Sequence, residues 1–280
     1  KDRFHTMSNN AKMNVAVIFG GQSSEHEVSR VSVTMVLNNI DREKYNVYMT
    51  GITKDGRWYL YEGPVDLIAG GEWETSGKTT QAFISPDAAL HGMVVMRDSG
   101  AEIIKLDAVF PVMHGKNGED GTIQGLCELA HLPCVGCDLT SSAVCLDKAL
   151  TNTVLEYAGI PQAKFIWFYA PYFEKHMDEI LDQIEDNLGY PCFVKPANAG
   201  SSVGISKCDR RGDVIDAVRF AAGHDRKIVV EENISGQEVE VAVLGNDEPI
   251  ASVVGEIIPA AEWYDYDAKY NDEASKLLIP

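Results

Sequence analysis

The chain has 280 residues, of which 45% are hydrophobic, so it can bury a substantial core and divide into two or three lobes. Its 24 Lys and Arg against 42 Asp and Glu give a formal charge of −18, which argues against nucleic acid or an anionic membrane as the main partner. The sequence has no apolar run long enough for a membrane span and no signal peptide, so we expect a cytoplasmic protein.

The first part of the chain predicts strands alternating with helices. Residues 1–12 have no apolar period, and we expect them to be a leader outside the fold. An apolar strand at Val15–Phe19 is followed by Gly20 and Gly21 and then by an amphipathic helix through Leu37. Ser24 and Glu27 have the spacing of a capping box at the start of that helix.

The remaining elements of this part complete an open parallel α/β (Rossmann-like) lobe, which we place at residues 13–139. The expected strands are Val47–Ile52, Ile103–Phe110 and Pro133–Gly136, and the expected helix is Thr122–Ala130; the next expected helix, Ser142–Ala158, begins after the end of the lobe.

The second part predicts a mixed α+β layer rather than another parallel sheet. We expect helices at Tyr172–Asn187 and Asp213–Ala222, and strands at Cys192–Lys195, Gly204–Lys207, Ile228–Glu232 and Glu238–Leu244. A strand, a glycine loop and a strand predict a hairpin. The subdomains are expected at residues 140–225 and 226–280, and an ending inside an apolar, strand-like segment suggests a missing C-terminal part.

Six cysteines are spread along the chain without the density of a small disulfide-rich scaffold. Cys134 and Cys137 have the spacing of a redox or zinc pair. No second Cys or His pair follows at zinc-finger spacing, which favours a structural interpretation.

Three segments carry residues suited to binding or catalysis. The loop from Lys195 to Gly204 has small residues, hydroxyls and a lysine, so it can hold phosphates, although a hairpin turn with a surface lysine has the same composition. The strand around Glu231 leads to Glu238, which can bind ribose hydroxyls or simply face solvent. Glu25 and His114 each follow a predicted strand, where parallel sheets form their ligand crevice; a loop or capping role is the alternative for His114.

Together these segments resemble the D-alanine–D-alanine ligases of the ATP-grasp superfamily. The resemblance covers about Met13 to Pro280. The segments that carry it are Gly20–Ser29, His114–Thr122, Leu146–Lys148, Phe193–Pro196, Gly200–Gly204 and Tyr264–Tyr270.

The resemblance implies that ATP activates one D-alanine as an acyl phosphate, which the amine of a second D-alanine then opens. Glu25 would bind the first ammonium group, with Gly20 and Gly21 lining that site, and His114 would lie beside the reacting carboxylate. The residues implied for ATP are Lys148, Lys195, Ser201, Ser202, Val203, Glu231, Glu232, Asn233, Ile234, Glu238 and Lys269.

Residues 264–270 resemble the loop that closes over this site and excludes water. The resemblance implies that Tyr270 bonds with Ser201 and Glu25, so that these three count as catalytic. Tyr270 after Lys269, where depsipeptide-forming relatives have a histidine, favours D-alanine over D-lactate and leaves D-serine open.

The resemblance also implies Mg2+ or Mn2+, a homodimer through the N-terminal domain, and a role in peptidoglycan precursor synthesis. The family's metal ligands lie beyond Pro280, so none is named here, and we expect the 280-residue chain alone to be inactive or nearly so.

Three other functions are considered. A nucleotide-binding fragment without catalysis and an ATP-grasp ligase for D-serine or another amino acid remain open. A nicotinamide dehydrogenase is disfavoured, because Gly20-Gly21 is not part of a G-x-G-x-x-G motif.

Overall fold

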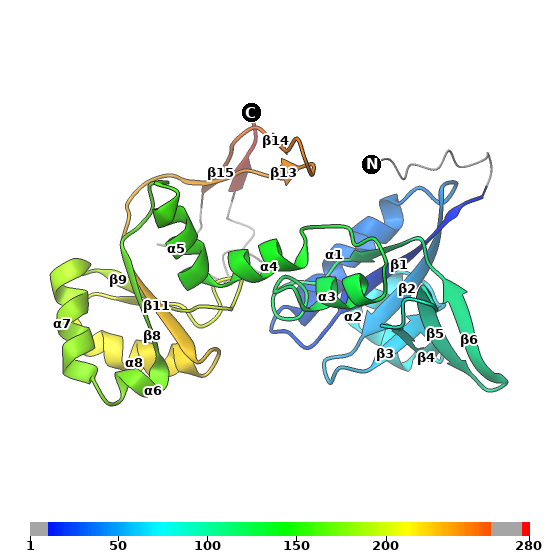
Figure 1. Ribbon diagram of the computed structural model, residues 1–280, viewed down its shortest axis with the longest axis horizontal. Coiled ribbons are helices and arrows are strands. Elements are labelled where there is room, and N and C mark those ends of the chain that lie inside the picture. The colour runs from blue at the N-terminus through cyan, green and yellow to red at the C-terminus, as the bar shows by residue number, and fades with distance from the viewer. Residues whose placement is uncertain (1–10, 259–275) are drawn as a thin grey trace. The chain divides into compact units, whose positions relative to one another are not determined.

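The computed structural model describes residues 11–258 and 276–280. The chain divides into two compact units, one ending at Leu146 and the other beginning at Asp147 (Figure 1). The predicted boundaries at residues 139 and 225 remain predictions.

The first unit is built on one seven-stranded sheet with the order β6-β5-β4-β3-β2-β1-β7. Its strands are β1 (Met13–Gly20), β2 (Tyr45–Ile52), β3 (Trp58–Tyr61), β4 (Thr79–Ile84), β5 (Gly92–Arg97), β6 (Gly100–Lys105) and β7 (Ala108–Pro111). The predicted parallel arrangement is confirmed for β1, which pairs in parallel with β2 and β7. Strands β3 to β6 extend the sheet in antiparallel fashion and were not predicted as such.

Two predicted strands of this unit need correction. The segment Ile103–Phe110 is not one strand, because β6 ends at Lys105 and β7 begins at Ala108. Between them the chain changes its partner strand from β5 to β1. The N–H of Asp107 donates to the carbonyl of Asn14, and the carboxylate of Asp107 accepts from the N–H of Asn14. The segment Pro133–Gly136 forms only a bridge, between Cys134 and Val109.

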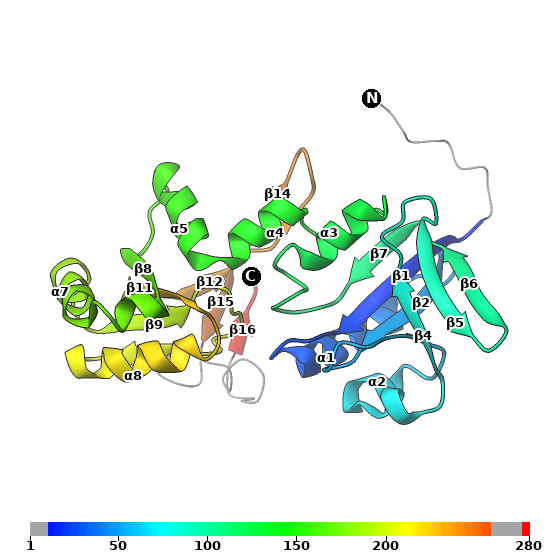
Figure 2. The ribbon, with the colours of Figure 1, turned by 60° about the horizontal axis from the view of Figure 1, so that its bottom comes forward.

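Alternate residues of β1 pack against opposite layers, as the period of a strand requires. Val15, Val17 and Phe19 face α1 (His26–Asn39), α2 (Asp66–Gly70) and the 3-10 turn η1 (Glu72–Thr75). Ala16 and Ile18 face the layer that contains α3 (Thr122–Leu129). Figure 2 shows α1 and α2 on one side of the sheet and α3 on the other. Strand β1 is therefore buried on both faces, and its carboxyl end is the place where loops meet.

The second unit begins with a four-stranded antiparallel sheet of order β10-β9-β11-β8. Its elements are α5 (Lys148–Tyr157), β8 (Phe165–Tyr169), α6 (Ala170–Phe173), α7 (Met177–Asn187), β9 (Cys192–Pro196), β10 (Ser206–Cys208), α8 (Arg211–Ala222) and β11 (Lys227–Glu232). The apolar sides of α7 and α8 form one core with this sheet, and Ala149 of α5 packs on its other face. The predicted β9–β10 hairpin is confirmed.

The predicted helix Ser142–Ala158 is wrong as a single element. It is divided into α4 (Leu139–Leu146) and α5 by Asp147, whose backbone is extended with φ −75° and ψ 101°. The Asp147 carboxylate accepts hydrogen bonds from the N–H groups of Ala149 and Leu150, which makes it the N-cap of α5. Likewise, the predicted helix Tyr172–Asn187 is interrupted between α6 and α7.

The end of the described chain forms short strands. A three-stranded sheet has the order β12-β15-β16, with β12 (Glu238–Glu240), β15 (Gly255–Ile258) and β16 (Lys276–Leu278), and β13 (Val243–Leu244) pairs with β14 (Ile250–Ala251). The predicted strand Glu238–Leu244 is thus two strands, which pair in different sheets. Within residues 11–258 and 276–280, no helix is both long and apolar enough to cross a membrane.

Candidate functional site

The turn after β1 requires glycine. Gly20 has φ +84°, and a Cβ at this position would lie 2.2 Å from the carbonyl oxygen of Ile52. The N–H of Gly20 donates to Ser29 Oγ (2.8 Å), and the Ser29 hydroxyl donates to the carbonyl of Val112. These bonds connect the turn to α1 and to the segment after β7, so the loops at the carboxyl ends of neighbouring parallel strands are held together.

Glu25 is 3% exposed and is the N-cap residue of α1. The predicted capping box is wrong, because the helix begins at His26 and no side chain caps it; the hydroxyl of Ser23 instead accepts from the N–H of Glu25 (3.0 Å). Gly115, with φ +65°, passes so close that a Cβ there would lie 2.1 Å from Glu25 Oε2. The glycine after His114 therefore leaves space for this buried carboxylate.

His114 is held between two polar side chains. Its Nε2 lies 2.9 Å from Ser32 Oγ on α1, and its Nδ1 lies 3.8 Å from Glu119 Oε1. The interaction with the Glu119 carboxylate raises the pKa of His114 above its usual value, and the negative charge of Glu25 adds to this effect. The structure thus brings Glu25 and His114 within electrostatic reach of one another.

A cavity of about 300 Å³ opens beside these loops. Its wall includes Gly21 after β1, Ile52 at the end of β2, and Met113 and Asn117 after β7. Ligands of open α/β sheets bind at the carboxyl ends of parallel strands, and this cavity lies at those ends.

Lys148 is the first residue of α5 and is fixed by the chain that follows β9. Its N–H donates to the carbonyl of Ala197 (3.1 Å), and its Nζ donates to the carbonyl of Ala199 (2.6 Å). Burial lowers the pKa of Lys148, and the nearby positive charge of Lys195 lowers it further. The two lysines, 47 positions apart in the sequence, are therefore close in space.

Lys195 on β9 pairs with Glu231 on the adjacent strand β11, with 2.5 Å between Nζ and Oε2. The amide of Asn152 on α5 donates to the other carboxylate oxygen of Glu231 (3.0 Å). The pKa of Glu231 is lowered, since the positive charges of Lys195 and Lys148 outweigh the cost of its burial. Two ammonium groups and one carboxylate thus form a partly buried cluster with a net positive charge.

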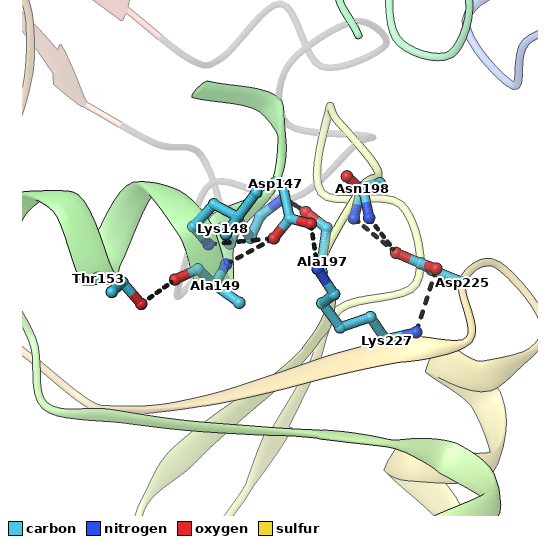
Figure 3. A network of polar contacts seen from close by, with 9 residues as sticks. Asp147, Lys148, Ala149, Thr153, Ala197, Asn198, Asp225 and Lys227 are labelled. Atoms are coloured by element: carbon cyan, nitrogen blue, oxygen red, sulfur yellow. Dashed lines mark hydrogen bonds and ion pairs between the residues drawn. The ribbon is translucent and has the colours of Figure 1, made fainter. Parts of the chain in front are cut away.

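The loop that follows Lys195 is anchored at its base (Figure 3). Asn198 donates both its main-chain and its side-chain N–H to Asp225 Oδ2, each at 2.8 Å. Farther along, Ser201 and Ser202 have φ +49° and +60°, and the N–H of Val203 donates to the carbonyl of Gly200 (3.0 Å). Successive residues with positive φ turn main-chain N–H groups toward one side, as in anion-binding loops.

The other residues implied for ATP are arranged less closely. Glu232, at the end of β11, accepts from the N–H of Lys164 (2.7 Å). Asn233 and Ile234 follow β11, and Ile234 is 64% exposed. Glu238 lies on β12 with an exposed side chain. Lys269 and Tyr270 lie outside the described residues.

The cysteines support the structural interpretation of Cys134. Its thiol hydrogen-bonds with that of Cys127, whereas Cys137 is exposed. Over the described ranges, no group of three or more His, Cys, Asp or Glu could hold a metal ion. A zinc site is therefore not supported there, and the predicted Mg2+ or Mn2+ is assigned no ligands.

Sequence reasoning missed the residues that hold the others in place. Asn152, Ser32 and Glu119 act through Glu231 or His114. Lys227, with a side chain that is 17% exposed, pairs with Asp147 and lies over the ring of Trp167. A signal existed only for Glu119, which belongs to the His114 segment, and for Asp147, which belongs to the segment Leu146–Lys148.

Comparisons with known proteins agree with this arrangement. Residues 14–137 match the family described as D-ala D-ala ligase N-terminus, and residues 154–280 match D-ala D-ala ligase C-terminus. The D-alanine–D-alanine ligase of Acetivibrio thermocellus is 50% identical over 96% of this chain and 74% of its own length.

Solved structures give the same result. The VanG D-Ala:D-Ser ligase from Enterococcus faecalis has a TM-score of 0.83 and 41% identity over 95% of this chain and 76% of its own. The D-alanine–D-alanine ligase from Coxiella burnetii has a TM-score of 0.79 and 35% identity over 88% and 71%. These matches confirm the ATP-grasp fold, and the chain belongs to the D-alanine–D-alanine ligase family.

Proposed function

We propose that the residues of this chain serve the ATP-dependent ligation of two D-alanine molecules, which supplies D-alanyl-D-alanine for peptidoglycan synthesis. The observation that carries this proposal is the cluster of Lys148, Lys195 and Glu231. Two lysines from separate elements meet beside a loop with positive φ angles, an arrangement suited to a triphosphate.

Lys148 and Lys195 hold the phosphates of ATP in this proposal, and ATP supplies the phosphoryl group that turns a carboxylate into an acyl phosphate. Lys195 would exchange part of its contact with Glu231 for a phosphate oxygen. Asn152 keeps its hydrogen bond to Glu231, so that this carboxylate stays satisfied when the lysine moves. Ser201, Ser202 and Val203 are assigned to the phosphates, and Glu231 to Ile234 and Glu238 are assigned to the nucleoside.

Glu25 and His114 bind the first amino acid in this proposal. A buried carboxylate at the N-cap of a helix suits an ammonium group, which is positively charged at neutral pH. His114, whose pKa is raised by the interaction with Glu119, suits the amino acid's carboxylate. Gly20 and Gly21 are assigned to the same amino-acid site, and Gly21 is part of the wall of the cavity of about 300 Å³. Lys269 and Tyr270 remain predictions for the closing loop, as do the metal ion, the cytoplasmic location and the homodimer.

A ligase that adds D-serine is the second candidate, because the VanG D-Ala:D-Ser ligase is 41% identical over 95% of this chain. The second amino acid, not the chemistry, distinguishes the two candidates.

The test is release of phosphate from ATP in the presence of D-alanine, D-serine or D-lactate, with the product identified by its mass. Because the chain spans 74% of the length of the Acetivibrio relative, the assay is run on this chain and on a hybrid continued past Pro280 with that relative's residues. D-alanine-dependent phosphate release with a dipeptide product supports the proposal. ATP binding without any amino-acid-dependent release by the hybrid would support the nucleotide-binding alternative.

A further inference from the structure

Two cysteines face one another across the β9–β10 hairpin. Cys192 and Cys208 are directly opposite in the antiparallel register, and both are 0% exposed in the same apolar core. Opposite residues of such strands have Cα atoms about 4.5–5.5 Å apart. A disulfide requires about 4.4–6.8 Å, so the backbone already has the spacing of a cross-strand disulfide.

The side chains are oriented for the same bond. Both cysteines are free thiols, and they hydrogen-bond to one another. The bond that the Cys208 thiol donates lowers the pKa of Cys192 and raises that of Cys208. Cys192 is therefore the better nucleophile of the pair.

We propose that Cys192 and Cys208 are an oxidation site, at which a peroxide converts two facing thiols into a disulfide across the base of the loop that follows Lys195. The loop leaves β9 at Pro196 and returns at Ser206, so the disulfide would join the two strands that bear it. This inference concerns the chain's own thiols and holds whichever substrate the enzyme ligates.

The chemistry is balanced with hydrogen peroxide as the oxidant. The Cys192 thiolate attacks one oxygen of the peroxide, the O–O bond breaks, and hydroxide leaves, giving a sulfenic acid. The Cys208 thiol then passes its proton to that hydroxide and attacks the Cys192 sulfur, which displaces a second hydroxide; this second hydroxide takes up the proton released by Cys192. Two thiols are oxidised by two electrons, and one peroxide is reduced to two waters.

Access to the buried thiols comes from the edge of the sheet. β10 has three residues and, among the described strands, lies at the edge of the order β10-β9-β11-β8, where it pairs with β9. Short edge strands open locally at lower free energy than central ones. We therefore expect the pair to oxidise more slowly than the exposed Cys137 and Cys145.

The test treats the purified 280-residue chain with hydrogen peroxide, blocks the remaining thiols and maps the cysteines by mass spectrometry. Trypsin gives Cys192 in the peptide 176–207 and Cys208 in the peptide 208–210. The expected product joins these two peptides, is about 2 Da lighter than their sum, and separates with dithiothreitol. Hydrogen exchange of residues 206–208 should also slow at least about tenfold in the oxidised chain, because the disulfide resists opening of β10.

Cys208→Ser and Cys208→Ala are the controls. Each should abolish the linked peptide and leave Cys192 as a sulfenic acid or its overoxidised forms. Peroxide treatment that oxidises Cys137 and Cys145 in the unaltered chain, while Cys192 and Cys208 both remain blockable thiols, would overturn the proposal. A linked peptide with unchanged exchange at β10 would overturn the claim that the bond restrains the hairpin.

Discussion

Replacing Asp147 by alanine tests how α5 is held. Asp147 caps the helix through the N–H groups of Ala149 and Leu150, at 3.1 and 3.2 Å, and also pairs with Lys227 (Figure 3). Loss of an N-cap costs about 1 kcal/mol. Removing one partner of a buried ion pair costs about 3–5 kcal/mol. We expect a smaller cost of about 2 kcal/mol here, because the Lys227 side chain is 17% exposed and water can solvate its charge in part. Asp147→Ala should therefore lower the local unfolding free energy by about 3 kcal/mol.

The asparagine variant separates the two contributions. Asparagine caps a helix as well as aspartate does but carries no charge, so Asp147→Asn should cost about 2 kcal/mol. Thr153→Ala is the matched control, since it removes only a hydroxyl that donates to the Ala149 carbonyl within the same helix (2.7 Å), and should change stability by less than about 0.5 kcal/mol.

The measurement is hydrogen exchange of the amides in α5 and β11, read by mass spectrometry, because a chain of two units does not unfold in a single step. Protection should be highest in the unaltered chain, lower in the Asp147→Asn variant and lowest in the Asp147→Ala variant. Equal protection in all three chains would refute both contributions of Asp147. Equal losses of protection in the asparagine and alanine variants would refute a separate contribution of the helix cap.

Further predictions concern the loops of the first unit and the buried lysine. Gly115→Ala places a methyl group against Oε2 of Glu25 at φ +65°, and should lower Tm by several degrees and weaken D-alanine binding, as calorimetry would show. The pKa of His114, measured by NMR, should lie above 6.5, and Glu119→Gln should bring it down toward that value. Because the pKa is raised in the folded chain, the stabilisation of the fold by protonated His114 is complete below pH 6.5 and is lost as the pH rises through the folded pKa. The pKa of Lys148, measured by NMR on 13C-labelled lysine, should lie below 10.5 in the folded chain and nearer to 10.5 in urea. The same pKa in both conditions would contradict the burial of this side chain.

Elements with a strong apolar period could be predicted from the sequence. The runs that became β1, β2 and α3 show this, since burial on one or both faces is encoded in neighbouring residues. The division between α4 and α5 could not be predicted, because the helical pattern continues through Asp147. What interrupts it is pairing with Lys227, 80 positions away.

The site divides in the same way. Lys148 and Lys195 could be named from their motifs, because a phosphate site needs cations beside a small-residue loop. Asn152 and Ser32 carry no such signal, since each touches a residue far away in the sequence, Glu231 or His114. Strands β3, β4 and β5 were missed, and β6 was predicted only at Ile103–Lys105, because these strands are partly polar and their pairing in the sheet defines them.

The double attachment of Lys148 to the chain after β9 has a mechanical consequence. Its main chain holds the Ala197 carbonyl and its side chain holds that of Ala199, while Asp147, the first residue of the second unit, is fixed by Lys227. The start of α5 is therefore tied to the first residues of the loop that follows β9. A ligand that displaces this loop would therefore also displace Lys148 and the adjacent Asp147, where the polypeptide passes from one unit to the other.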